Sequence, residues 1–142
     1  MEWNYYDTFI TVAADCPAEF GMIPPAKKSG LTIPGIEYAL AADRPYRYTQ
    51  EELLYQVYVR HKQIAESELS LRDAALREEF YGKPKPCMRA SMLPKKYGWG
   101  IHFNREGKLA LVPMESPEYA SFVEGRMDGV KLVPAMRNTR KK

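Results

Sequence analysis

A dense group of side chains that could do chemistry lies in residues 86–102. This run carries a thiol, a hydroxyl, an imidazole, three cationic side chains and two aromatic rings, and prolines and glycines interrupt it. Side chains of these types are more typical of a loop and strand that face a ligand than of a core element. The run matches no signature of a known reaction, so it indicates where a site lies without naming a reaction.

Anion binding is the main functional prediction for this run. Its arginine can bind a carboxylate or phosphate through two parallel hydrogen bonds, and its lysines add point charge. An aromatic side chain beside them could stack on a ring, whereas Trp99 is expected in the core. The alternative is a solvated basic face that only keeps the protein soluble. The predicted ligand is an anionic small molecule or partner, and the predicted site residues are Arg89, Ser91, Lys95, Lys96, Tyr97 and His102.

An enzyme that uses Cys87 or His102 is a second hypothesis. A neighbouring imidazole and the nearby cations could convert the Cys87 thiol into a reactive thiolate. However, the two residues are 15 positions apart in sequence, which fixes no geometry, and no third group that would orient the imidazole is evident. We therefore favour an unreactive, buried Cys87 and a His102 that is exposed or hydrogen-bonded.

The sequence offers no cluster of metal ligands. His61 and His102 are the only histidines and fall in different predicted elements, and the two cysteines, Cys16 and Cys87, do not have the spacing of a ligand pair. Zinc and iron sites draw on several such side chains held close together. We therefore predict neither a metal nor a cofactor.

The distribution of charge suggests a third hypothesis. Residues 1–80 carry 8 Lys or Arg and 13 Asp or Glu, a net charge of −5, whereas residues 81–142 carry 13 and 5, a net charge of +8. A basic second half with interleaved aromatic side chains is compatible with binding of single-stranded nucleic acid. The net charge of only +3 for the whole chain argues against that hypothesis, and we do not favour it.

Composition indicates one cytoplasmic domain. A chain of 142 residues with 45% hydrophobic and 27% charged residues is ordinary for a globular protein of a single domain. No apolar run is long enough to cross a membrane, and the first residues lack the pattern of a signal peptide. We therefore expect the two cysteines to be free thiols in a reducing cytoplasm.

The first half of the chain predicts one strand followed by helices. Residues 6–14 are rich in β-branched and aromatic side chains and predict a strand. A short helix is expected over residues 32–42. Thr49 and Glu52 have the spacing of a capping box and predict the start of a second helix. A third helix is expected over residues 70–82.

The second half predicts mainly strands. Residues 99–103 alternate between the two faces of a strand, and a turn at residues 104–107 leads into a partner strand over residues 108–112. Ser116 is expected to cap a helix, and residues 130–133 predict a last strand. Together these elements predict an α+β fold.

The predicted α+β architecture is a single domain over residues 1–136, followed by a frayed basic tail over residues 137–142. About four strands form a small, mainly antiparallel sheet, and helices pack on one face of it. The strand face that carries His102 would then be solvated and available for binding.

Several short motifs are spread over nearly the whole chain. They are Tyr6-Asp-Thr-Phe9, Asp15-Cys-Pro17, Pro45-Tyr-Arg-Tyr-Thr49, Pro86-Cys-Met-Arg-Ala-Ser91, Lys96-Tyr-Gly-Trp-Gly-Ile-His102, Gly107-Lys108 with Ala110-Leu111, and Met136-Arg137. In these motifs the chain resembles a family of small, mostly bacterial proteins known only as domain of unknown function 6157. The resemblance implies a single-domain protein of this length and supplies no activity, so no catalytic residue is carried over. The chain departs from the family's pattern at Pro94.

Overall fold

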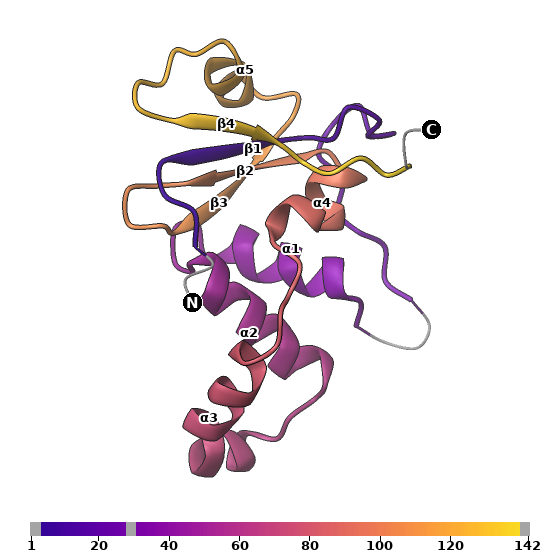
Figure 1. Cartoon of the computed structure of the whole chain (residues 1–142). Helices are drawn as coiled ribbons and strands as arrows, with labels where there is room; N and C mark the ends of the chain where they lie inside the picture. Colours follow the sequence, from indigo (N-terminus) through magenta and orange to yellow (C-terminus); the bar gives the residue numbers. More distant parts are fainter. Residues whose placement is uncertain (1–3, 28–30, 140–142) are drawn as a thin grey trace.

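Helices and strands are segregated along much of the chain, as a computed structural model shows for residues 4–27 and 31–139 (Figure 1). In this part of the chain no helix is long and apolar enough to cross a membrane. In chain order the elements are β1 (Thr8–Thr11), α1 (Ile33–Asp43), α2 (Gln50–His61), α3 (Glu66–Tyr81), the short 3-10 helix η1 (Met88–Ala90), α4 (Met92–Lys95), β2 (Trp99–Phe103), β3 (Leu109–Pro113), α5 (Pro117–Val123) and β4 (Lys131–Pro134).

The four strands form one sheet in the order β3-β2-β1-β4. β2 and β3 pair as an antiparallel hairpin, and β1 pairs antiparallel with β2, so that Thr8 lies opposite Phe103. β4 adds to the other edge of β1 in the parallel direction, with Thr8 opposite Lys131. The α+β fold with a four-stranded sheet is confirmed, and the parallel β1–β4 pair makes the sheet mixed.

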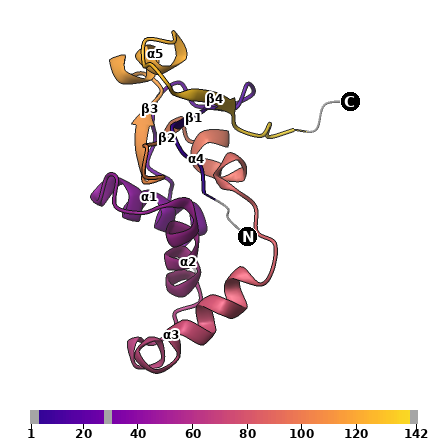
Figure 2. The same cartoon turned by 60° about the vertical axis from the view of Figure 1, so that its left-hand side comes forward.

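One face of the sheet packs against α1 and α2, as the view in Figure 2 shows. Ile101 and Phe103 point to this face, as their alternation in the sequence predicts, and both are fully buried. Trp99 shares the face and packs against Tyr38 of α1, with ring centroids 5.4 Å apart. The main core therefore lies between the sheet and these two helices. Its other buried members include Ile10, Ile36, Leu53, Val57, Met88 and Leu109.

The opposite face is covered by α5, an addition to the predicted arrangement of helices on one face (Figure 2). Phe9 and Val112 point to this side of the sheet, where they would be exposed without a cover. Phe122 of α5 stacks on Phe9 with a centroid separation of 4.3 Å and an interplanar angle of 5°. This second, smaller core explains why a helix as short as α5 holds its position.

The helices α1, α2 and α5 each begin at a residue whose side chain caps them, as predicted for Thr49 and Ser116. Thr32, Thr49 and Ser116 each accept a hydrogen bond from a backbone amide in the first turn of α1, α2 and α5. The carboxylate of Glu52 does not turn back toward Thr49 as in a capping box, because it binds the Arg77 guanidinium at 2.7 Å. This ion pair joins α2 to α3.

Two predicted boundaries were wrong. The first strand is shorter than residues 6–14, because Asp7 has a φ of 46° and the Val12 amide donates to the Tyr119 hydroxyl instead of a neighbouring strand. The third helix begins at Glu66, ahead of residue 70. Its N-cap residue, Ala65, has no side chain that could cap a helix and so leaves no sequence signal.

Candidate functional site

The structure divides the predicted binding face between different parts of the fold. Arg89 lies beside the end of β4, where its Nε donates to the Pro134 carbonyl oxygen at 2.6 Å. Ser91 is buried against α1. His102 lies on the other face of the sheet, where its ring contacts Phe122 of α5 at a centroid distance of 4.6 Å. Arg89 and His102 therefore do not face one ligand.

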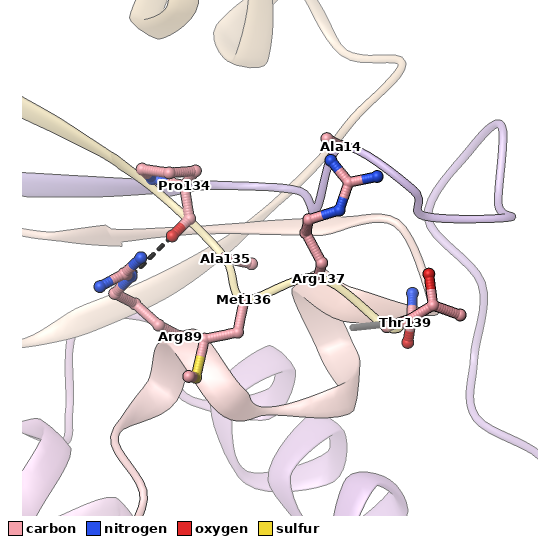
Figure 3. A pocket seen from close by; sticks show the side chains of 8 residues that line it. Ala14, Arg89, Pro134, Ala135, Met136, Arg137 and Thr139 are labelled. Carbon is pink, nitrogen blue, oxygen red and sulfur yellow. Dashed lines mark hydrogen bonds between the residues drawn. The ribbon is translucent and has the colours of Figure 1, made fainter. Parts of the chain in front are cut away.

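Arg89 lines an open cavity of about 710 Å³, here called the arginine cavity (Figure 3). The cavity lies between η1, the loop after β1 and the segment that follows β4. Figure 3 shows the Arg137 side chain extending toward Ala14, whereas the Arg89 side chain extends toward Pro134. Two guanidinium groups from distant segments therefore line the same cavity. The remaining lining residues are Ala135, Met136, Asn138 and Thr139.

Asp15 fixes the chain that carries Arg137. Its carboxylate accepts hydrogen bonds from the backbone amides of Asn138 and Thr139 at 2.8 and 2.9 Å and from the Thr139 hydroxyl at 3.1 Å. The two amide hydrogen bonds are the main reason why the pKa of Asp15 falls to about 2. The side-chain amide of Asn138 also donates to the Lys95 carbonyl oxygen. Residues 137–139 are thus held in place, whereas the sequence predicts a frayed tail over residues 137–142. Residues 140–142 lie outside the described residues.

The two arginines of the cavity have no acidic partner in residues 4–27 and 31–139. Among the described residues no carboxylate lines the cavity, and the nearby Asp15 carboxylate accepts from the backbone amides of Asn138 and Thr139. An unpaired guanidinium keeps its positive charge and its hydrogen-bond donors at any physiological pH. The arginine cavity is therefore suited to a ligand with negative charge.

Lys95, Lys96 and Tyr97 do not line the arginine cavity. Lys96 is exposed, and its Nζ lies 5.9 Å from the centre of the Tyr97 ring. The Tyr97 carbonyl oxygen accepts a hydrogen bond from the Met22 amide, which holds the loop before α1 against this turn. These three residues form a basic surface next to the cavity.

Ser91 and Cys87 line a different cavity, here called the Glu37 cavity, of about 600 Å³. The Ser91 hydroxyl donates to Glu37 Oε1 at 2.7 Å and also accepts the Leu93 amide as the cap of α4. The Tyr5 hydroxyl donates to Cys87 Sγ at 3.4 Å. Burial, followed by this hydrogen bond, raises the pKa of Tyr5 to about 12, so Tyr5 retains the proton that it donates.

His102 and Cys87 do not form a catalytic pair, because the sheet separates them. Cys87 lies on the side of α1 and α2, whereas His102 faces α5. The Nδ1 of His102 forms a hydrogen bond with the Tyr46 hydroxyl at 2.9 Å. Burial lowers the pKa of His102, and the Asp7 carboxylate opposes that effect. His102 therefore favours its neutral form, which agrees with its aromatic neighbours.

The described part of the chain contains no group of three or more histidine, cysteine or carboxylate side chains close enough to hold a metal ion. Cys16 and Cys87 are both free and half-buried.

Sequence reasoning missed two residues that the cavities bring forward. Arg137 belongs to the predicted frayed tail, although the Met136-Arg137 motif matches the family pattern and was a signal that this segment has a defined role. Glu37 was not singled out. It is nevertheless the only charged residue of α1 before Asp43, in a helix that is otherwise apolar, and that isolation was a usable signal.

Comparison with other proteins places the chain in a family without assigning an activity. Neither the curated proteins nor the solved structures contain a match. A family model does match, over residues 1–141, and its description is a family of unknown function, DUF6157. The chain belongs to this family.

Proposed function

We propose that this protein binds an anionic small molecule, one that bears carboxylate or phosphate groups, in the arginine cavity. The observation that carries the proposal is that Arg89 and Arg137 both line one cavity, whose described wall residues include no carboxylate. A volume of about 710 Å³ is enough for a ligand with two separate anionic groups, one for each guanidinium.

The backbone around the cavity supports such binding because it holds both arginines in place. The Nε of Arg89 is anchored on Pro134, which leaves its two terminal nitrogens for a bidentate contact. Arg137 follows Met136, whose amide donates to the Arg89 carbonyl oxygen at 2.8 Å. Groups that are already ordered lose less entropy when a ligand binds.

Calorimetric titration with citrate and with inorganic phosphate tests the proposal. We expect Arg137→Met to weaken citrate binding by about tenfold or more, since it removes one charge-assisted contact and leaves the fold untouched. Arg105→Met is the matched control, because Arg105 is exposed in the β2–β3 turn and carries the same charge. Arg89→Lys keeps the charge and loses the bidentate geometry, so it should also weaken binding.

Three results would overturn the proposal. They are the absence of binding by both anions, equal affinities for wild type and Arg137→Met, and an Arg105→Met effect as large as that of Arg137→Met. A single-stranded oligonucleotide forms a further arm of the titration. If it binds much more tightly than citrate and its affinity falls steeply with salt, the nucleic-acid hypothesis replaces this one.

A further inference from the structure

The Glu37 cavity has the shape and the lining of a small-molecule site. It lies between α1, α2, the end of α3 and the segment from residue 85 to residue 92, which runs past α2 in Figure 1. Its volume of about 600 Å³ is within the range that holds small organic ligands. Its wall is mainly apolar and includes Ile33, Pro34, Leu54, Val57, Phe80 and Met92.

Glu37 places a buried carboxyl group in this apolar wall. The residue is only 4% exposed, and its hydrogen bond from the Ser91 hydroxyl is the one that it makes in the described part of the chain. Burial raises the pKa of Glu37 to about 7, although the hydrogen bond opposes the rise. A buried carboxylate is costly unless it is paired with a cation and fully hydrogen-bonded.

The cations of the wall do not supply that partner. Among the residues that the structure describes, Glu37 forms no ion pair with any lysine, arginine or histidine. Lys85 Nζ lies over the Phe80 ring, 4.7 Å from its centre, and Lys62 is exposed at the end of α2. Among the described residues, the titratable groups that line the cavity besides Glu37 are Tyr58, His61, Lys62, Lys85 and Cys87.

We propose that the Glu37 cavity binds a small organic ammonium ion, whose apolar body lies among the side chains of the wall and whose ammonium group pairs with Glu37. The ammonium group provides the positive charge that the buried carboxylate lacks and a hydrogen-bond donor for it. The apolar wall recognises the hydrocarbon part of the ligand. A hydrated inorganic cation does not fit, because the described residues of the wall include no second carboxylate that could replace its lost water ligands.

Straight-chain alkylammonium ions from butyl to octyl are the probes. Calorimetric titration at about pH 8.5 should show affinity that rises by about fourfold for each added methylene until the chain fills the cavity. Hexanol, which has the same body without the charge, should bind at least about tenfold more weakly than hexylammonium. At about pH 5.5 Glu37 is protonated and binding should weaken, while the ammonium group stays charged.

Two variants connect this binding to the residues. Glu37→Gln keeps an acceptor for the Ser91 hydroxyl but removes the charge, and it should weaken hexylammonium binding by about tenfold or more. Asp43→Asn is the matched control, because it removes one charge from an exposed position of the same helix. Ala90→Leu places a larger apolar side chain in the wall without a change in charge, and it should shorten the longest chain that binds.

Alkylation of Cys87 gives a readout that does not depend on affinity. Cys87 lines the cavity, whereas Cys16 does not, so hexylammonium should slow the reaction of iodoacetamide with Cys87 and leave Cys16 unaffected. The proposal is overturned if no alkylammonium ion binds, if Glu37→Gln binds as tightly as wild type, or if hexanol equals hexylammonium. Binding that strengthens as the pH falls would also overturn it, since the ligand would then prefer a protonated Glu37.

Discussion

Replacement of Glu37 by glutamine should change how stability depends on pH. Burial moves the pKa of this carboxyl from 4.5 to about 7, so the folded state holds the proton more tightly than the unfolded chain. The stability that this proton provides is fully present below about pH 4.5 and is lost as the pH rises through about 7. Each factor of ten in proton affinity is worth about 1.4 kcal/mol, so the loss amounts to about 3 kcal/mol.

Urea unfolding of wild type and Glu37→Gln, followed by circular dichroism, measures this effect. At about pH 4.5 both side chains are neutral and the two proteins should have similar free energies of unfolding. At about pH 8 the variant should be more stable than wild type by about 3 kcal/mol, because it has no buried charge. The difference between the two proteins isolates Glu37, since every other titrating group is common to both.

The reasoning would be refuted by one clear result. If the two stability curves run parallel from about pH 4.5 to about pH 8, the Glu37 carboxyl has the same pKa in the folded and unfolded states. Asp43→Asn serves as the control, because it removes the same charge from an exposed position of α1.

Three further substitutions test how the elements are held together. Arg77→Met should lower the free energy of unfolding by about 1–2 kcal/mol, because α3 loses its ion pair with Glu52 of α2; an unchanged urea midpoint would contradict this. Gly98→Ala should cost about 1–3 kcal/mol in a thermal melt, since φ is +80° and the added carbon would lie 2.5 Å from a carbonyl oxygen; a melt like that of wild type would show that the turn relaxes. Asp15→Ala should speed hydrogen exchange at the Thr139 amide, and protection equal to wild type would show that Asp15 does not hold this segment.

Local signals predicted most of the helices and the β2–β3 hairpin, because caps and alternation act between near neighbours in sequence. Thr49 and Ser116 are examples, since each lies within three residues of the amide that it caps. The parallel pairing of β1 with β4 has no local signal, because its partners are about 120 residues apart in sequence. The position of α5 depends on Phe9 in the same way.

The sites were harder to predict than the fold, because their residues meet only through tertiary packing. Arg89 was identified from its basic surroundings, but Arg137 joins it only because Asp15 holds the following residues. His102 was grouped with Arg89 by closeness in sequence, whereas the sheet places it on the opposite side. The raised pKa of Glu37 depends on burial that no spacing of residues reveals.

The central place of β1 in the sheet also determines the order in which the protein can fold. Thr8 pairs with Phe103 on one side and Lys131 on the other, so both pairings close long loops and carry the entropy cost of closure. The β2–β3 hairpin closes a short turn and can form first, and it then exposes the apolar face around Ile101 until β1 arrives. We therefore expect folding in milliseconds to seconds. The intermediate that contains only the hairpin should be the species most prone to aggregation, because its β2 edge is still unpaired.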